Sequence, residues 1–143
     1  MKKGLALVVS IVILGGSLVN GVVMTYANNH TDTRFSFYYY GDGSDTAIPP
    51  RSKQDNTASY MKNNATSPTL AVCVAGTNSL SSYSGLEPNY CSGPMEVPSG
   101  SYRYIPNSVY GQYRYAYLTM GCDDKMEHTI SGKWSPDNIS GRY

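Results

Sequence analysis

The sequence predicts an all-β fold, either a small antiparallel β-sandwich or a partly open barrel, that follows an N-terminal signal peptide. Three observations support this prediction. Short β-favouring segments recur along the chain, with turn signals about every 8–12 residues. The composition includes 14 tyrosines but only two phenylalanines and one tryptophan, and tyrosine favours strands. After residue 27 we find no convincing helical periodicity, so strands are expected to build the core.

The first 27 residues have the pattern of a secretory signal peptide. Met1-Lys2-Lys3 gives a positive start, a mostly apolar stretch runs from Leu5 to Met24, and Thr25-Tyr26-Ala27 places small residues where a signal peptidase reads them. Glycines and polar residues interrupt the second half of the apolar stretch, which favours cleavage after Ala27; an uncleaved membrane anchor is the alternative. We therefore expect one secreted β-rich domain over residues 28–143, with no membrane association after cleavage.

Six segments carry the strand pattern, and glycine, proline or asparagine follows most of them. The expected strands are 34–40, 57–62, 69–75, 101–105, 112–120 and 128–130. The segment 69–75 is the most apolar, so it is expected in the middle of a sheet. We expect Ile48-Pro49-Pro50 to be a stiff loop and 78–101 to be a long loop or an irregular hairpin.

Three cysteines lie in the part expected to be exported: Cys73, Cys91 and Cys122. Cysteines outside the cell tend to pair, and three cannot all pair within one chain. We expect a Cys73–Cys91 disulfide, because the intervening segment is rich in turn-forming residues; closing that loop would contribute roughly 3 kcal/mol. Cys91–Cys122 is the alternative pairing. The remaining thiol is expected either to be buried or to link a dimer.

Charge excludes two classes of partner. The chain has 11 basic and 10 acidic residues, and two of the basic residues belong to the signal peptide. The exported domain is therefore close to neutral or slightly acidic. Nucleic-acid binding requires clustered Lys and Arg, and membrane-disrupting peptides are strongly cationic, so neither function is expected.

The candidate ligand-binding residues are tyrosines on two expected strands. Three project from one side of the strand 112–120, and two from the strand 101–105: Tyr113, Tyr115, Tyr117, Tyr102 and Tyr104. The opposite side of the longer strand is aliphatic and is expected to face the core: Ala116, Leu118 and Met120. Exposed aromatic stripes can stack on sugar rings or on a protein partner. The alternative is that the rings are buried or only stabilise the sheet as a cross-strand ladder.

Catalytic and metal-binding signals are weak. The chain has only His30 and His128, and no established nucleophile, zinc or phosphate-binding motif. His128 directed at Cys122 or a serine would be the basis of a hydrolase. Asp42-Gly43-Ser44-Asp45 and Asp123-Asp124 offer oxygen ligands for calcium, but plain turns explain both better. We therefore expect no enzyme activity and no cofactor.

Several motifs, taken in order, resemble a family of small uncharacterised secreted proteins of Gram-positive bacteria, recorded as a domain of unknown function. These motifs are Asp32-Thr33-Arg34-Phe35-Ser36-Phe37, Arg51-Ser52-Lys53-Gln54-Asp55-Asn56-Thr57 and Ser131-Gly132-Lys133-Trp134-Ser135-Pro136-Asp137. The resemblance implies export and a compact β-rich domain, and it implies no reaction.

The charged and aromatic residues of these motifs are expected to have structural roles. Arg51, Lys53 and Asp55 alternate along the chain and are expected to pair with one another or with Asp137. Trp134 is expected to close one end of the core.

Export, near-neutral charge and the tyrosine stripes predict a secreted, non-enzymatic interaction module at the cell envelope. Its expected partner is cell-wall glycan or an envelope protein. A secreted bacteriocin-like toxin or signalling protein is the alternative, and a hydrolase built on His128 is a third hypothesis.

Overall fold

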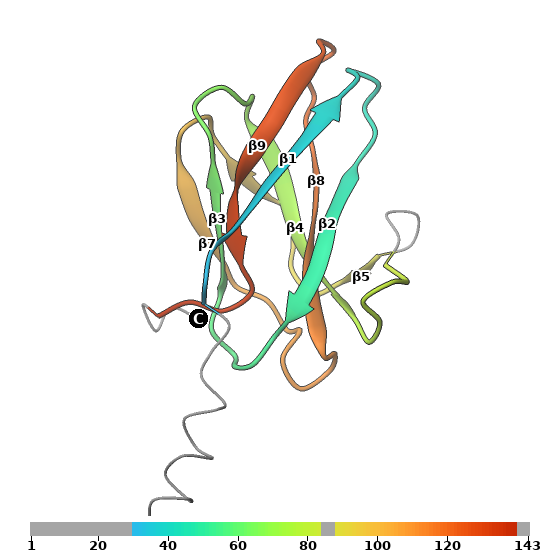
Figure 1. Cartoon of the computed structure of the whole chain (residues 1–143), viewed down its shortest axis with the longest axis vertical. Coiled ribbons are helices and arrows are strands. Elements are labelled where there is room, and N and C mark those ends of the chain that lie inside the picture. Colours follow the sequence, from blue (N-terminus) through green and yellow to red (C-terminus); the bar gives the residue numbers. More distant parts are fainter. Residues whose placement is uncertain (1–29, 84–87, 140–143) are drawn as a thin grey trace, which may run out of the picture.

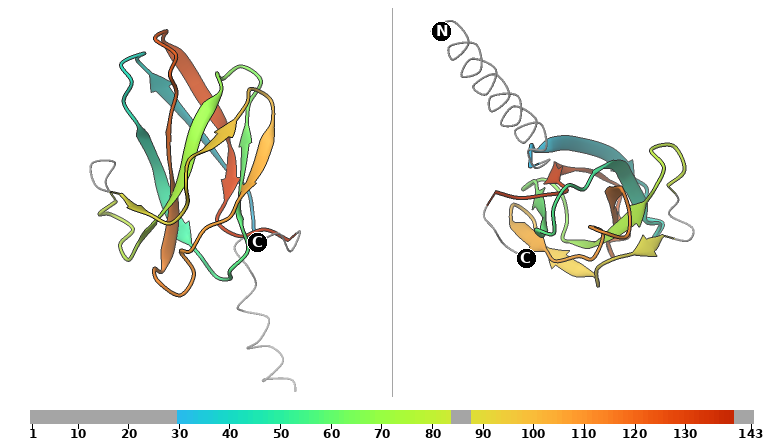
Figure 2. Two further views of the ribbon diagram at one scale, coloured as in Figure 1. Left: turned by 180° about the vertical axis from the view of Figure 1, so that it is seen from behind. Right: turned by 90° about the horizontal axis from the view of Figure 1, so that it is seen from below.

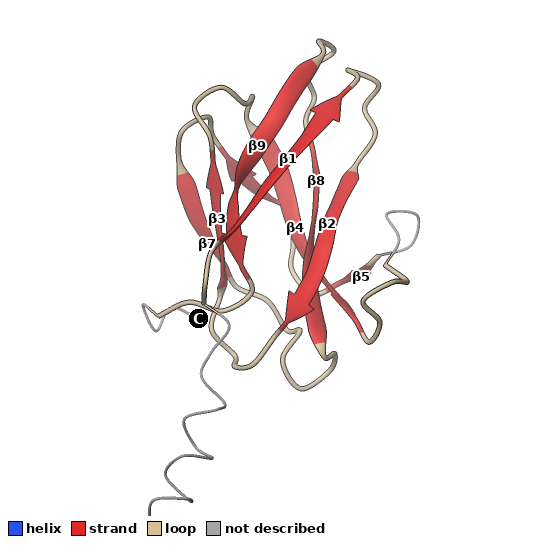
Figure 3. Cartoon of the chain, viewed as in Figure 1, coloured by secondary structure: helices blue, strands red, loops and turns tan. Residues whose placement is uncertain are grey.

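Two antiparallel β-sheets pack face to face as a sandwich in the computed structural model, which describes residues 30–83 and 88–139 (Figures 1 and 2). Every regular element of this part is a strand (Figure 3). The all-β prediction is confirmed, and the sheets do not close into a barrel within the described ranges. The expected signal peptide, residues 1–27, lies outside the described residues.

The four-stranded sheet has the order β1-β9-β3-β7. Its strands are β1 (Thr33–Tyr39), β9 (His128–Ser135), β3 (Ser59–Asn63) and β7 (Tyr102–Ile105). The five-stranded sheet has the order β2-β8-β4-β5, and β6 also pairs with β4. Its strands are β2 (Thr46–Ser52), β8 (Tyr115–Gly121), β4 (Leu70–Thr77), β5 (Asn89–Tyr90) and β6 (Met95–Val97).

The core lies between the two sheets because alternate residues of each strand point inward. The four-stranded sheet contributes Met61, Ile105, Ile130 and Trp134, and the five-stranded sheet contributes Ile48, Leu70, Val72, Val74, Leu118 and Met120. The most apolar expected strand became β4, which lies between β8 and β5 and is therefore central, as predicted. Trp134 is completely buried, so its predicted place in the core is confirmed.

The segment Ile48-Pro49-Pro50 is part of β2, so its prediction as a loop was wrong. Proline lacks the N–H that a ladder needs and is tolerated at sheet edges and bulges. Here β2 is an edge strand, and its register with β8 shifts between Ile48 and Arg51, where the prolines lie.

The last strand was expected over 128–130 but is longer and continues through Gly132 to Ser135. A Cβ at Gly132 would collide with the carbonyl oxygen of Lys62 and with the ring of Phe35. A glycine in a strand can mark such a close approach rather than a strand end. β9 therefore runs on to Ser135 and pairs with β1 on one side and β3 on the other.

A buried ion pair ties the end of β9 to the segment after β2. Lys53 Nζ lies 2.9 Å from Asp137 Oδ1, and neither side chain is exposed. The same ammonium group donates to the carbonyl oxygens of Pro136, at 2.7 Å, and Thr57. One of the pairings expected for Lys53 is therefore confirmed. Arg51 instead donates to the carbonyl oxygens of Thr31 and Trp134.

Within residues 30–83 and 88–139, no helix has the length and apolar character needed to span a membrane.

Candidate functional site

Three tyrosine rings cluster on the outer face of the four-stranded sheet, and we call this cluster the tyrosine face: Tyr60, Tyr102 and Tyr104. The register of β3 and β7 places Tyr60 directly opposite Tyr104. The centroids of the three rings are 5.6 to 6.0 Å apart. The neighbouring residues Met61 and Ile105 are buried, which fixes the three rings on the outer side.

The tyrosine face is open to solvent at one end. Tyr102 has 53% of its surface exposed, whereas Tyr60 and Tyr104 are half-buried. Burial, followed by the charge of Asp32, raises the pKa of Tyr60, so its hydroxyl remains a neutral hydrogen-bonding group. The rings therefore offer both stacking surface and polar tips to a ligand.

Sequence reasoning identified Tyr102 and Tyr104 but missed Tyr60. Tyr60 lies in the expected strand 57–62, so it was recognisable as a strand residue. Its role depends on the pairing of β3 with β7, and the partner of a strand cannot be read from its alternation alone.

The tyrosines of β8 have a different environment. As predicted, Ala116, Leu118 and Met120 face the core, which places Tyr115 and Tyr117 on the outer face of the five-stranded sheet. Tyr117 is only 2% exposed, and the ring of Tyr83 packs 5.7 Å from it, centroid to centroid. Burial also raises the pKa of the Tyr117 hydroxyl. Tyr117 is therefore covered, while Tyr115 is half-buried.

Tyr113 lies before β8 and does not share the side of Tyr115 and Tyr117. Its ring packs against the core and fills the space beside Gly76 that a Cβ would need. Gly76 lies opposite the core residue Ala116 in the sheet, which places Tyr113 on the inner side. The expected exposed stripe of Tyr113, Tyr115 and Tyr117 is therefore not formed, because the strand begins only at Tyr115.

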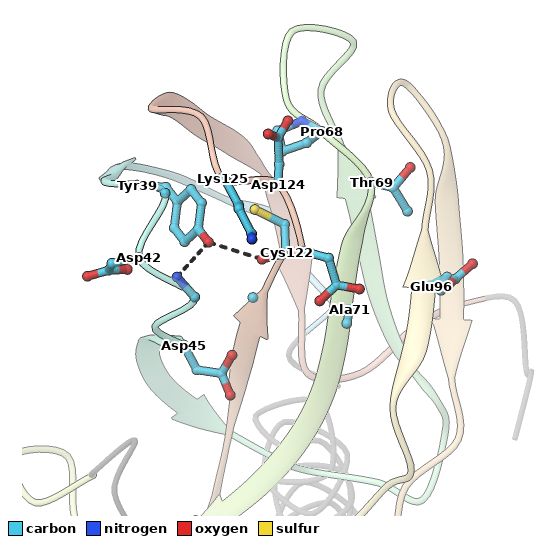
Figure 4. Close-up of a pocket in the computed structure, with 14 residues that line it drawn as sticks. Tyr39, Asp42, Asp45, Pro68, Thr69, Ala71, Glu96, Cys122, Asp124 and Lys125 are labelled. Atoms are coloured by element: carbon cyan, nitrogen blue, oxygen red, sulfur yellow. Dashed lines mark hydrogen bonds between the residues drawn. The ribbon is translucent and has the colours of Figure 1, made fainter.

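A second candidate region is an acidic hollow of about 700 Å³ where the β1–β2 and β8–β9 loops meet (Figure 4). The Tyr39 hydroxyl holds the two loops together, since it donates to the carbonyl oxygen of Cys122 and accepts from the N–H of Gly43, each at 3.0 Å. Five acidic residues line this hollow: Asp42, Asp45, Glu96, Asp123 and Asp124. The structure thus brings together the acidic segments 42–45 and 123–124, for which the sequence favoured plain turns over calcium ligation.

The geometry of the acidic hollow does not assemble a metal site. Figure 4 shows the carboxylates of Asp42, Asp45 and Asp124 pointing in different directions. In the described part of the chain, no three His, Cys, Asp or Glu side chains are grouped so that they could hold a metal ion. Asp42 instead caps its own turn, accepting from the hydroxyl and the N–H of Ser44, which lowers the pKa of Asp42.

His128, the residue considered as a catalytic base, lies next to a carboxylate. Its Nε2 is 2.7 Å from Asp124 Oδ2. The N–H of Met126, at 2.9 Å, and then His128 lower the pKa of Asp124. The contact thus joins Asp124 in the β8–β9 loop to the first residue of β9.

The predicted Cys73–Cys91 disulfide is absent, and all three cysteines, which lie in the described ranges, are free thiols. The N–H of Cys91 donates to the carbonyl oxygen of Val74, so Cys91 lies next to Val74 rather than next to Cys73. Successive residues point to opposite faces of a sheet. Cys91 therefore packs against the core, while Cys73 lies on the outer face opposite Thr119. Burial raises the pKa of both thiols, which lowers their reactivity.

Comparison with known proteins identifies a family but no characterised relative. Residues 23–138 match the family described as Protein of unknown function (DUF2712), so the chain belongs to this family. The match covers most of the chain, including every strand described above. No curated protein and no solved structure matches the chain.

Proposed function

We propose that this member of the DUF2712 family is a secreted, non-enzymatic interaction module that binds cell-wall glycan through its tyrosine face. The single observation that carries the proposal is the clustering of Tyr60, Tyr102 and Tyr104 on one outer sheet face, with centroids no more than 6.0 Å apart. Tyr102 is half exposed at the edge strand β7, so a ligand can reach the rings without displacing other parts of the chain.

Tyrosine suits a sugar ligand for two reasons. Its ring offers a flat apolar surface for the C–H groups of a sugar ring, and its hydroxyl can hydrogen-bond to sugar hydroxyls. The rings belong to paired strands, which hold them in place before a ligand arrives and reduce the entropic cost of binding. A near-neutral domain also avoids non-specific attraction to charged surfaces.

A pull-down on purified bacterial cell wall tests the proposal. The exported protein, expected to begin at Asn28, is compared with the variant Tyr102→Ser/Tyr104→Ser. The matched control is Tyr90→Ser/Tyr110→Ser, which removes two tyrosines that are 56% and 52% exposed elsewhere on the molecule. Unchanged melting transitions of both variants establish that they are folded.

We expect the wall to retain the unmodified protein and the control. The Tyr102→Ser/Tyr104→Ser variant should bind at least about tenfold more weakly. Equal retention of all three proteins would mean that the tyrosine face is not the binding surface. No retention of the unmodified protein would overturn wall binding itself.

A further inference from the structure

Three basic side chains form a row across the outer face of the four-stranded sheet, beside the tyrosine face. Arg34 on β1 lies directly opposite Lys133 on β9, and Lys133 lies directly opposite Lys62 on β3. Adjacent strands are about 4.8 Å apart, so the basic row spans about 10 Å. Met61 beside Lys62 and Trp134 beside Lys133 are buried, and Phe35 beside Arg34 packs partly buried against the core. The three charged side chains therefore point away from the core.

This row is unfavourable for the isolated protein. Like charges directly opposite each other destabilise a sheet. Within the described ranges, ion pairs join Lys53 to Asp137 and His128 to Asp124, and none involves Arg34, Lys62 or Lys133. Asp32 is close enough to influence Tyr60 and Arg51 electrostatically, but a single carboxylate cannot balance three cations. The basic row therefore has unused capacity to bind an anion.

A hollow of about 490 Å³ lies at one end of the row. Arg34 and Lys133 line it together with the polar side chains of Ser36, Ser131 and Asn64. The Asn64 amide donates to the hydroxyl of Ser131 at 2.8 Å, which orders this part of the hollow. Guanidinium and ammonium groups bind phosphate through charge-assisted hydrogen bonds, and hydroxyl and amide groups around them can supply further donors.

The opposite end of the row reaches the tyrosine face. Lys62 lies directly opposite Tyr102, and Tyr60 and Tyr104 form the next cross-strand pair. One extended ligand could therefore place anionic groups on the cations and a ring on the tyrosines. We infer that the ligand of this face is an anionic wall polymer, built of sugar or polyol units joined by phosphodiesters. This inference rests on the proposed function and names the class of its ligand.

Two other anionic partners fit the face less well. Helices and loops that bind a membrane surface insert Trp, Phe or Leu, whereas the exposed large hydrophobic side chains of this sheet face are the tyrosines Tyr38 and Tyr102. A nucleic-acid surface needs a more extensive basic patch than three cations, and the whole chain has a net charge of only +1.

The test compares binding to two preparations of one Gram-positive cell wall: intact wall, and wall from which the phosphate-linked polymers have been removed by acid extraction. The variant Arg34→Gln/Lys133→Gln removes two charges of the basic row. Its matched control is Arg114→Gln/Lys125→Gln, which removes one exposed arginine and one exposed lysine elsewhere. Vesicles of anionic phospholipid and a DNA duplex are included as alternative ligands.

We expect the unmodified protein to bind intact wall and to lose most of its binding on the extracted wall. On intact wall, Arg34→Gln/Lys133→Gln should bind roughly 5- to 30-fold more weakly, with the control unchanged. Added salt should weaken binding of the unmodified protein more than that of the variant.

The outcomes separate this inference from the proposed function. Equal binding to intact and extracted wall, still abolished by Tyr102→Ser/Tyr104→Ser, would overturn the inference that the ligand is a phosphate-linked polymer. It would leave the proposed glycan binding in place. Tighter binding to the vesicles or the DNA than to intact wall would overturn it in favour of those ligands. Absence of binding to either wall would overturn the proposed function and the inference together.

Discussion

The ammonium group of Lys53 is fully buried, and its environment explains how the fold tolerates it. Lys53 carries three N–H donors, and three acceptors surround it: the Asp137 carboxylate and the carbonyl oxygens of Pro136 and Thr57. The second carboxylate oxygen of Asp137 accepts from the N–H of Gln54 at 3.0 Å. Each charge is thus paired and hydrogen-bonded, which is the condition for burying an ion without a large penalty.

Removal of both partners should therefore destabilise less than the sum of the two single removals. We expect Lys53→Met or Asp137→Asn alone to lower the free energy of unfolding by about 3–5 kcal/mol, because each leaves the other polar group buried without its partner. The double variant Lys53→Met/Asp137→Asn should lose clearly less than the sum of the two. Urea denaturation of the four proteins measures this coupling, and additive losses would show that the pair acts as two independent groups.

Sequence reasoning worked at some residues and failed at others for identifiable reasons. It placed Trp134 in the core, because a large aromatic side chain is expected to be buried. It also named Asp137 as a partner for Lys53, because alternating charged side chains are expected to pair. It failed for Cys73 and Cys91, since their pairing depends on which residue of β4 faces Cys91. That register is fixed by the backbone bond to Val74, which the sequence does not reveal.

At the scale of the strands, alternation of apolar residues predicts which side of a strand faces the core, but it does not predict which other segments pack beside that strand. The alternation in β8 correctly predicted which side faces the core, because burial imposes a period of two. It could not predict that Tyr83 would cover Tyr117. The tyrosine face likewise depends on the pairing of β3 with β7, so only two of its three members were recognised.

The basic row makes a stability prediction that belongs to the sheet. Lys133 on β9 lies between Arg34 and Lys62, so its charge is repelled from both sides. We expect Lys133→Gln to raise the free energy of unfolding by about 0.5–1 kcal/mol. Lys125→Gln in the β8–β9 loop, a control without a cation opposite it in a strand ladder, should change stability by no more than about 0.5 kcal/mol.

Urea unfolding midpoints of the three proteins decide this question. A more stable Lys133→Gln variant that also binds wall polymer less well would mean that the row is kept for binding at the expense of stability, as is common at functional sites. A less stable variant would assign Lys133 a structural role in the sheet.

At the scale of the whole molecule, the sandwich places its two candidate surfaces apart. The tyrosine face and the basic row lie on the outside of the four-stranded sheet, whereas the acidic hollow lies where loops from both sheets meet. Strand length and turn spacing predicted an antiparallel fold, either a sandwich or a partly open barrel, and the structure is the sandwich. It did not predict that the acidic turns at 42–45 and 123–124 would meet, because their proximity follows from the order of strands in the two sheets.

The acidic hollow should make the stability of the molecule sensitive to acid. Hydrogen bonds from Ser44 lower the pKa of Asp42, and the N–H of Met126 together with His128 lowers the pKa of Asp124. A carboxyl group whose pKa is lower in the folded than in the unfolded state stabilises the fold above its unfolded pKa of about 3.9. That stabilisation is lost as the pH falls through the lower, folded pKa. We therefore expect stability to decline below about pH 4.

Urea denaturation between pH 7 and pH 2.5 tests this expectation with Asp42→Asn/Asp124→Asn. The variant should be less stable than the unmodified protein at neutral pH. The difference in stability should shrink as the pH falls, because protonation removes from the unmodified protein the two carboxylate charges that the variant already lacks. Ser44→Ala is the matched control: Asp42 remains ionisable but loses a donor, so the acid-dependent change should become smaller without disappearing. A difference between the proteins that stays constant down to pH 2.5 would show that these two loops are held by their backbone hydrogen bonds and not by the two charges.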